Sequence, residues 1–220
     1  MNTNDNIKRI LCFGDSITWG YIPNSGHNRY RASVRWTGVL QNLLGNSYEI
    51  IEEGLNSRGI LHGDNRPGKE GRNAMDYIIP CLDTLDPLDY VIVFLGTNEL
   101  KAELDLSPEE IGENLKILLN IIIQRPSQFR EEKPKLILVN PPVLNENTEY
   151  ALKGDKYKGA TEKSLALGIV FKKIASDIGA TFVDVQDKLN IGEDGVHMLP
   201  EAHEILGKEL YNVIHNANIQ

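Results

Sequence analysis

The first apolar run of the chain reads Arg9-Ile10-Leu11-Cys12-Phe13, and Gly14-Asp15-Ser16-Ile17-Thr18-Trp19-Gly20 follows it directly. A short, continuous apolar run is typical of a parallel strand that is buried on both faces. A serine in the turn after such a strand lies at the carboxyl edge of the sheet, where doubly wound sheets bind their ligands. The hydroxyl of Ser16 is therefore a candidate nucleophile, although Asp15 and Ser16 are also residue types that cap a following helix.

Four more apolar runs of this kind follow along the chain, and helical periodicity fills the segments between them. The expected strands are Arg9–Phe13, Tyr48–Glu52, Tyr90–Leu95, Lys135–Asn140 and Thr181–Val185. The expected helices are Trp36–Leu44, Asn73–Leu82, Ser107–Gln124, Thr161–Ile178 and Pro200–Ile214. Repeated strand–helix units with right-handed crossovers predict an α/β fold of three layers, with about five parallel strands in a doubly wound sheet.

Helix boundaries and loops support this assignment. Ser107-Pro108-Glu109-Glu110 combines a capping serine, a first-turn proline and a capping-box carboxylate, and Gly179 suits the end of the fourth helix. No repeat, linker or change of composition marks a boundary, so we expect a single domain over residues 1–220. Three long irregular connections, at residues 21–35, 56–72 and 141–159, are expected to form the ordered walls of a pocket.

The composition describes an ordinary globular chain with an acidic balance. Of 220 residues, 41% are hydrophobic, and 23 Lys and Arg against 31 Asp and Glu give a net charge of −8. Such a field repels phosphate backbones and anionic lipid surfaces, so neither nucleic acid nor a membrane is an expected partner. No apolar run reaches membrane-spanning length, and the polar segment Met1–Arg9 lacks the apolar core of a signal peptide. We therefore expect a cytoplasmic protein whose two cysteines, Cys12 and Cys81, are free buried thiols.

A serine hydroxyl needs a base to take its proton, and the chain has five histidines. His197 stands out because it follows Asp194-Gly195-Val196 in the loop between the last strand and the last helix. A short turn through Gly195 can bring the Asp194 carboxylate to the imidazole Nδ1, which fixes the tautomer and orientation of the ring. Taken alone, this segment also fits an ordinary turn with a capping aspartate. The other histidines are expected at solvated surface positions: His27, His62, His203 and His215.

Two further turns are candidates for stabilising a developing oxyanion. Gly96-Thr97-Asn98-Glu99 ends the third expected strand, and the amide of Asn98 can donate a hydrogen bond there. The turn Glu52-Glu53-Gly54-Leu55-Asn56-Ser57, after the second strand, can offer a backbone N–H. Neither turn is specific by itself, because both compositions are common in ordinary turns.

In this order, the segments resemble the sequence blocks of the SGNH hydrolases, the family of GDSL-type esterases and lipases. Ser16 in Gly-Asp-Ser-Ile matches the first block, Asn98 in Gly-Thr-Asn-Glu the third, and Asp194 with His197 the fifth. The strings at residues 11–16, 34–40 and 51–55 look like the arylesterase/acyltransferase branch, typified by a mycobacterial enzyme. Three departures are visible: Ile17 replaces leucine, Glu99 replaces aspartate, and the second block has Glu52, Gly54 and Ser57 where the family has Asn-x-Gly-x-x-Gly.

The resemblance implies a flavodoxin-like fold, a triad of Ser16, His197 and Asp194, and neither metal nor cofactor. It also implies an oxyanion hole made of the N–H of Ser16, the N–H of Ser57 and the side chain of Asn98. The implied activity is hydrolysis, or transfer, of short acyl groups from small or aryl esters by a homo-oligomer. Residues beside or within the blocks are expected to bind substrate: Trp19, Tyr21, Gly54, Lys101 and Val196.

Other functions stay open at this point. Within the family, a carbohydrate acetyl esterase and a lysophospholipase-like or thioesterase activity fit the same motifs. From another class, a flavodoxin-like module that binds a nucleotide or a flavin would use the same sheet. Such a module would leave the joint occurrence of Ser16, Asn98 and the Asp194–His197 segment unexplained.

Overall fold

The structure is a computed structural model that describes residues 6–64 and 66–217. Five parallel strands form one sheet in the order β2-β1-β3-β4-β5. They are β1 (Lys8–Gly14), β2 (Tyr48–Gly54), β3 (Tyr90–Phe94), β4 (Lys135–Val139) and β5 (Thr181–Val183). This is the flavodoxin-like order of a doubly wound sheet, so the predicted fold class is confirmed. The first five residues of the polar segment Met1–Arg9 lie outside the described residues.

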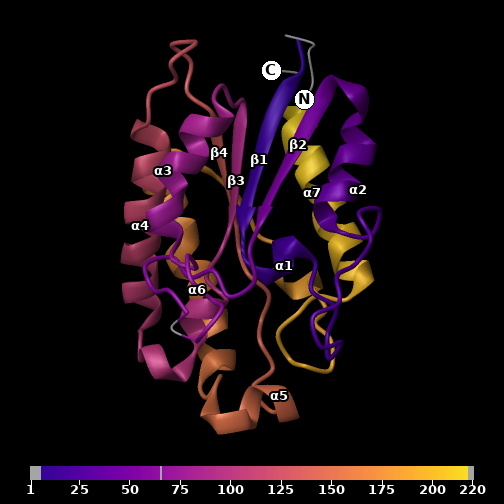
Figure 1. Cartoon of the computed structure of the whole chain (residues 1–220), viewed down its shortest axis with the longest axis vertical. Coiled ribbons are helices and arrows are strands. Elements are labelled where there is room, and N and C mark those ends of the chain that lie inside the picture. Colours follow the sequence, from indigo (N-terminus) through magenta and orange to yellow (C-terminus); the bar gives the residue numbers. More distant parts are fainter. Residues whose placement is uncertain (1–5, 65, 218–220) are drawn as a thin grey trace.

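Helices cover both faces of the sheet (Figure 1). The α-helices are α1 (Ser16–Trp19), α2 (Trp36–Leu44), α3 (Ala74–Leu85), α4 (Pro108–Gln124), α5 (Glu149–Leu152), α6 (Ala160–Ile178) and α7 (Pro200–Asn216). Short 3₁₀ turns lie between them: η1 (Gly45–Ser47), η2 (Asn98–Leu100), η3 (Ala102–Leu104), η4 (Lys153–Asp155) and η5 (Gln186–Lys188). Helices α3, α4 and α6 pack on one face of the sheet, and α2 and α7 pack on the other.

The strands alternate between two hydrophobic cores, which is the physical basis of the three layers. In β1, Leu11 and Phe13 belong to the core beneath α3, α4 and α6, whereas Ile10 and Cys12 belong to the core beneath α2 and α7. All four side chains are fully buried. Burial of each large apolar side chain stabilises the fold by roughly 1.5–3 kcal/mol. Both cysteines are free and buried, as the sequence predicts.

Strand β2 differs from the others because it forms an edge of the sheet. None of its seven residues is fully buried, so the expectation of a strand covered on both faces is wrong here. Glu52 accepts hydrogen bonds of 2.7 and 2.6 Å from the guanidinium group of Arg35 and one of 3.2 Å from Arg29. An edge strand does not need two apolar faces, and charged side chains protect it from pairing with other chains.

The element boundaries agree closely with those expected from the sequence. Helix α4 begins with the capping box, because Ser107 Oγ accepts the N–H of Glu110 at 3.2 Å and Glu110 Oε2 accepts the N–H of Ser107 at 2.8 Å. Gly179 ends α6 in the left-handed conformation, with a φ of 71°. The sequence does not predict α1 and α5, because four residues are too few to show helical periodicity.

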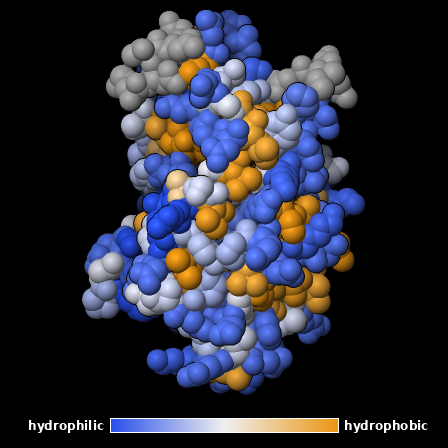
Figure 2. Space-filling view, turned by 90° about the vertical axis from the view of Figure 1, so that its right-hand side faces the viewer, coloured by the Kyte–Doolittle hydropathy of each residue, from blue (hydrophilic) through white to orange (hydrophobic). Residues whose placement is uncertain are grey.

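The carboxyl ends of the strands lie at one end of the molecule, together with α1 and α5 (Figure 1). The start of β1 and the end of α7 lie at the opposite end. The outer face formed by α2 and α7 is mostly hydrophilic, and hydrophobic residues show on it in separate patches (Figure 2). Among the helices within residues 6–64 and 66–217, none has the length and apolar character needed to cross a membrane.

Candidate active site

Ser16 lies at the switch point of the sheet, between β1 and β3, where the strand order reverses. It is the first residue of α1 and follows β1 after a single residue, Asp15. Asp15 caps the short helix, because its Oδ1 accepts the N–H of Ile17 at 2.9 Å. The two interpretations of this turn are therefore compatible, since Asp15 performs the capping and leaves the hydroxyl of Ser16 free for other contacts.

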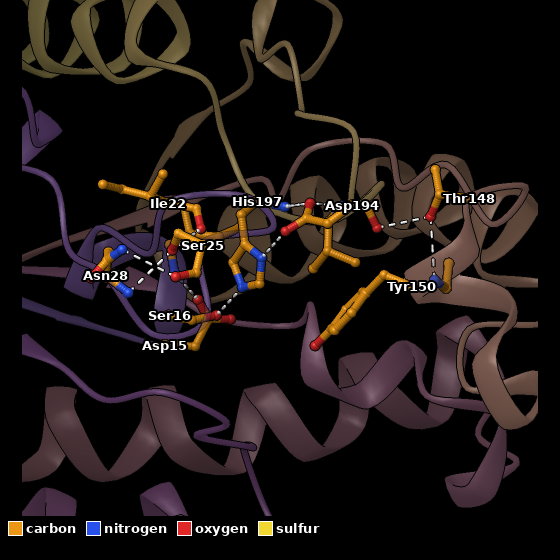
Figure 3. A network of polar contacts seen from close by, with 12 residues as sticks. Asp15, Ser16, Ile22, Ser25, Asn28, Thr148, Tyr150, Asp194 and His197 are labelled. Carbon is orange, nitrogen blue, oxygen red and sulfur yellow. Dashed lines mark hydrogen bonds and ion pairs between the residues drawn. The ribbon is translucent and has the colours of Figure 1, made fainter.

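The imidazole of His197 connects Ser16 to Asp194 (Figure 3). Its Nε2 lies 3.0 Å from Ser16 Oγ, and its Nδ1 lies 2.6 Å from Asp194 Oδ2. All three residues are buried, and only 6% of Ser16 is exposed. Donation of the Nδ1 proton to the carboxylate leaves Nε2 free to accept the proton of the serine hydroxyl.

The turn from Asp194 to His197 holds the carboxylate in place. Asp194 Oδ1 accepts the N–H of Val196 at 3.0 Å and that of His197 at 2.9 Å, while Oδ2 accepts from the imidazole. Burial raises the pKa of Asp194, but the hydrogen bond and charge of His197 and the two N–H groups outweigh it, so the pKa is lowered overall. Asp194 is therefore ionised at neutral pH. Gly195 has a φ of 75°, and a Cβ there would overlap the carbonyl of Asn145.

A distant loop fastens this turn, and the sequence gives no sign of it. Thr148, which caps α5, donates its hydroxyl to the carbonyl of Asp194 at 2.9 Å and accepts the N–H of Ala151 at 3.2 Å (Figure 3). The N–H of Asn145 also donates to the carbonyl of Gly195 at 2.9 Å. The connection between β4 and α6 thus sets the position of the imidazole through the backbone of its turn.

Two tyrosines flank the imidazole. The ring of Tyr21 stacks on that of His197, with centroids 4.3 Å apart and an interplanar angle of 27°. The ring of Tyr150, in α5, lies on another side, with its centroid 6.4 Å from that of the imidazole (Figure 3). An aromatic face attracts a cation, so Tyr21 favours the imidazolium that proton transfer creates. Tyr21 is a residue that the sequence singles out, whereas Tyr150 is not.

The three residues that are expected to donate to the oxyanion, Ser16, Ser57 and Asn98, line one cavity. Among the described residues, the backbone N–H groups of Ser16 and Ser57 have no hydrogen-bond acceptor. Asn98, at the start of η2, donates its side-chain amide to the carbonyl of Arg58 at 3.1 Å and to Asp15 Oδ2 at 3.5 Å. A substrate oxygen in this cavity could therefore accept two free backbone N–H groups beside an oriented amide.

Ser57 occupies a backbone conformation that favours glycine. Its φ is 67°, in the left-handed region, and its Oγ accepts a hydrogen bond of 3.2 Å from Arg66. The family blocks that this turn resembles have glycine at the corresponding place. The departure at Ser57 therefore keeps the N–H and the turn but adds backbone strain.

The side chain of Arg58 stabilises the same loop, and the sequence did not indicate this role. Its side chain is buried, with 2% of the residue exposed, and it donates to the carbonyls of Gly14 (3.0 Å) and Glu53. Its guanidinium carbon lies 4.2 Å from the centroid of the Phe13 ring. Because the carbonyl of Arg58 accepts the amide of Asn98, these contacts fix one expected oxyanion donor relative to the end of β1.

Two buried carboxyls, Asp15 and Glu99, lie next to the expected oxyanion donors. Burial raises the pKa of Asp15 to about 6, against the opposing effects of the Ile17 N–H and the charges of His197 and Arg58. Burial likewise raises the pKa of Glu99 to about 7. Glu99 Oε1 accepts the N–H of Ile60, and Oε2 has no partner among the described residues. Glu99 thus ties the loop after β2 to the turn that carries Asn98.

Comparison with known proteins identifies the family of the chain. The family model of the GDSL-like lipase/acylhydrolase family matches residues 12–205. The chain belongs to this GDSL-like family. It is similar to the native aryl esterase of M. smegmatis, with 33% identity over 95% of this chain and 99% of that chain, at a TM-score of 0.87. A carbohydrate acetylesterase of Sinorhizobium meliloti is 32% identical over 96% of this chain and 99% of that one, at a TM-score of 0.88.

A GDSL esterase/lipase of Arabidopsis thaliana is 25% identical to this chain over 228 aligned residues. The alignment includes 96% of this chain but spans only 65% of the plant protein's length. The sequence resemblance to the GDSL-type family is thus confirmed by both a family match and structural similarity.

In this GDSL-like chain, the cavity with Ser16 is small, at about 110 Å³. We call it the inner chamber. Its walls are formed by Ser16, Tyr21, His27, Asn56, Ser57, Arg66, Lys69, Asn98, Lys101, Tyr150, Lys156, Tyr157 and His197. An outer cavity of about 690 Å³ shares Tyr21, His27, Arg66, Lys101, Tyr150 and Lys156 with it. Both lie where the three long connections meet.

Of the five expected substrate-binding residues, Tyr21 and Lys101 line the inner chamber, and three do not. Val196 is 1% exposed and packs in the core beneath α3, α4 and α6. Trp19 is half-buried between Tyr21 and the guanidinium of Arg29, whose carbon lies 5.2 Å from its ring. A Cβ at Gly54 would overlap the backbone of Trp19, so this glycine permits close packing rather than contact with a ligand.

The expectation that His203 is solvated is wrong in this GDSL-family structure. It is 1% exposed, and its Nδ1 accepts the N–H of Trp36 at 3.3 Å. Burial, with the charges of Arg35 and His197, lowers its pKa to about 4. His27 and His215 are exposed as expected, and His62 is half-buried. His203 is buried because it lies on the face of α7 that packs against α2.

Proposed function

We propose that this chain is a serine ester hydrolase in which Ser16, His197 and Asp194 form the catalytic triad. The observation that carries the proposal is the continuous contact from Asp194 through His197 to Ser16, inside a cavity that also contains Asn98. A nucleotide- or flavin-binding module would have no use for this contact. Membership of the GDSL-like lipase/acylhydrolase family supports the same conclusion.

The chemistry follows from the positions of the three side chains. Ser16 Oγ attacks the ester carbonyl carbon while its proton passes to Nε2 of His197. The bond to the alkoxy oxygen then breaks, and His197 returns that proton to the leaving alcohol. Water attacks the acyl-Ser16 ester in the same way and releases the carboxylic acid. Asp194 keeps the ring in the required tautomer and stabilises the imidazolium.

The oxyanion of each tetrahedral intermediate would accept the N–H groups of Ser16 and Ser57 and the amide of Asn98. Support for Ser57 comes from its N–H, which has no acceptor among the described residues, and from its place in the inner chamber. Arg58 and Glu99 would hold this loop in register.

The size of the inner chamber supports short acyl groups. A cavity of about 110 Å³ has room for an acetyl or propionyl group but not for a long chain. Small and aryl alcohols would extend into the outer cavity beside Tyr21 and Tyr150. If a second alcohol replaces water there, the same acyl-enzyme gives acyl transfer. We propose hydrolysis as the main reaction and transfer as the side reaction.

Two related activities compete for the natural substrate. The similar M. smegmatis protein is an aryl esterase, and the similar S. meliloti protein is a carbohydrate acetylesterase. The aromatic walls of Tyr21, Tyr150 and Tyr157 favour an aryl or sugar ring over a flexible lipid chain. Rates of hydrolysis of phenyl acetate and of acetylated xylose, measured at equal concentration, distinguish an aryl esterase from a carbohydrate acetylesterase.

The test of ester hydrolysis is a series of p-nitrophenyl esters with acyl chains of two to eight carbons. We expect kcat/KM to be greatest for acetate and to fall steeply beyond butyrate, with an initial burst of p-nitrophenol if deacylation is slow. Absence of turnover with every ester, in protein that is folded by circular dichroism, would contradict the proposal. Visible absorbance of that sample would favour the flavin-binding alternative.

We also propose that the chain forms a homo-oligomer and acts in the cytoplasm. Exposed apolar side chains on two neighbouring helices support self-association: Ile117 on α4, and Leu165 and Ile169 on α6. Light scattering of the purified protein is expected to give the mass of more than one chain. A mass equal to one chain at micromolar concentration would contradict the oligomer.

A further inference from the structure

The charge of the inner chamber is opposite to that of the whole chain. The chain has a net charge of −8. Yet the inner chamber is lined by four cationic side chains, Arg66, Lys69, Lys101 and Lys156, and no aspartate or glutamate lines it among the described residues. The serine of the proposed hydrolase therefore lies in a cavity that is lined by cationic side chains within an acidic protein.

Three separate loops bring these cations together. Arg66 and Lys69 belong to the connection after β2, Lys101 lies between η2 and η3 after β3, and Lys156 follows η4 in the connection after β4. The N–H of Ala102 donates to the carbonyl of Lys156 at 2.9 Å, which holds the second and third loops side by side. Convergence from three loops at the edge that binds ligands is a feature of the fold and does not follow from neighbours in sequence.

Lys101 and Lys156 are the most enclosed of the four. Lys101 is 8% exposed, and its ammonium has no hydrogen bond or ion pair among the described residues. Lys156 donates to the phenolic oxygen of Tyr150 at 2.6 Å, and its nitrogen lies 4.1 Å from the centroid of that ring. Within the described part of the chain, neither ammonium has a carboxylate within salt-bridge distance. Arg66, in contrast, is paired with Asp64.

This arrangement has an energetic cost in the free protein. Burial lowers the pKa of Lys101. The charge of Asp64 opposes this effect and the charges of Lys156 and Arg66 add to it, so the pKa is lowered overall. Burial and, to a smaller extent, the charge of Arg66 also lower the pKa of Lys156, to about 8, although three nearby carboxylates act in the opposite direction: Asp64, Glu103 and Asp194. Unpaired cations that repel one another in an enclosed site are stabilised when a ligand supplies the opposite charge. A bound anion would remove this cost.

We propose that the ester substrate carries a carboxylate, which binds to the ammonium groups of Lys101 and Lys156. Lys69 and Arg66 attract the anion on its way in. This inference rests on the proposed ester hydrolysis and adds the substrate class: a half-ester of a dicarboxylic acid, or an ester of a hydroxy acid. A neutral alkyl or aryl acetate would be a secondary substrate.

The test compares carboxylate esters with their neutral methyl esters. Monophenyl glutarate carries the carboxylate on the acyl side, and 4-acetoxybenzoate carries it on the alcohol side. Release of the phenol from each ester, and from its methyl ester, gives two ratios of kcat/KM, anionic over neutral. Intrinsic reactivity differs between esters, so each ratio is compared between wild type and Lys101→Met, Lys156→Met and Lys158→Met. Lys158 is the matched control, because it is exposed and lines neither cavity.

We expect at least one ratio to fall about 10-fold in Lys101→Met and in Lys156→Met, in line with the loss of one charge-assisted hydrogen bond. A loss that affects neutral and anionic esters alike cancels in the ratio, and Lys158→Met should give the wild-type ratio. Raised salt should lower the wild-type ratio. If both ratios are the same in all four proteins, the carboxylate does not bind to these lysines and the inference is wrong.

A binding measurement separates this inference from the proposed function. Calorimetry with Ser16→Ala protein compares 4-hydroxybenzoate with its uncharged analogue 4-hydroxybenzamide. Preferential binding of the anion that disappears in Ser16→Ala/Lys101→Met supports the anion site even if no ester is turned over, and in that case only the proposed hydrolysis fails. Ester turnover without any preference for the anion leaves the hydrolase intact and rejects the anionic substrate.

Discussion

The imidazole Nε2 of His197 lies 3.0 Å from the hydroxyl of Ser16, although 181 positions separate the two residues in the chain. The doubly wound sheet makes this possible, because the turns after β1 and after β5 reach the same edge. The contact belongs to a chain of interactions that continues to Asp194 at 2.6 Å and, through the backbone of its turn, to Thr148. The proposed chemistry depends on this relationship.

Replacing either Ser16 or His197 by alanine is expected to lower kcat for p-nitrophenyl acetate on the order of 10⁴-fold. The double variant should be no worse than either single one, because the two side chains act as a unit. Circular dichroism and the melting temperature must show that each variant is folded. Near-normal turnover by folded Ser16→Ala protein would overturn the mechanism.

Asn98→Ala is expected to lower kcat by about 10²–10³-fold with little change in KM, since the amide acts on charge that develops in the transition state. The amide also donates to the carbonyl of Arg58, so some loss of stability is expected. Arg58→Met serves as the comparison, because it disturbs the loop that orients the amide but keeps the Asn98 side chain. If Asn98→Ala keeps full kcat, the amide is not an oxyanion donor.

Ser57→Gly is expected to retain kcat within about 3-fold, because only the backbone N–H is required, and to relieve the strain of a φ of 67°. Compared with Ser57→Ala, which keeps that strain, the glycine variant should have a free energy of unfolding about 1 kcal/mol higher in urea denaturation. Equal stability of the two variants would show that the left-handed conformation is not imposed by the fold. A large loss of activity in the glycine variant would show that the hydroxyl is needed.

His203→Asn is expected to make the protein less sensitive to acid. The pKa of His203 is lowered to about 4 in the folded protein, so the unfolded chain binds the extra proton first as the pH falls. Its stabilising contribution is complete above pH ~6.5 and is lost between there and pH 4, on the order of 3 kcal/mol. The asparagine can still accept the N–H of Trp36 but does not titrate. Urea unfolding at pH 7 and pH 4.5 measures the difference.

The raised pKa values of Asp15 and Glu99 act in the opposite direction, because the folded state binds those protons more tightly. Their contribution grows as the pH falls and is the same in wild type and in the His203→Asn variant, so it cancels in the comparison. If both proteins lose the same stability between pH 7 and pH 4.5, His203 does not titrate as its burial indicates.

Sequence was sufficient to predict the fold and to nominate the main residues of the candidate site, and the reason is physical. Parallel strands that are buried on both faces must be apolar, so the runs beginning at Arg9 and Tyr90 can be recognised as strands from their sequence. The polar residues that directly follow these strands must then lie at one edge of the sheet. That rule makes Ser16 and Asn98 candidates, and their occurrence together with Asp194 and His197 in the family's order selects them. The pairing of Asp194 with His197 depends on a local turn, which sequence also records.

What sequence could not supply depends on contacts between distant segments. The fastening of Asp194 by Thr148 joins residues 46 positions apart, and α5, which Thr148 caps, is too short to show a period. Arg58 is of a residue type that is almost never buried, so no pattern points to it. His203 did leave a signal, since it lies three residues before Leu206 on the buried stripe of α7. The gathering of cations from three loops is visible only in the folded chain.

The most direct measurement is labelling with a fluorophosphonate that reacts with activated serines, followed by intact mass and peptide mapping. If His197 activates Ser16, wild type gains one adduct per chain, the adduct maps to Ser16, and His197→Ala abolishes it while leaving the protein folded. An adduct on another residue, or none on folded wild-type protein, would contradict the triad. The nucleotide- or flavin-binding interpretation of this sheet would then take its place.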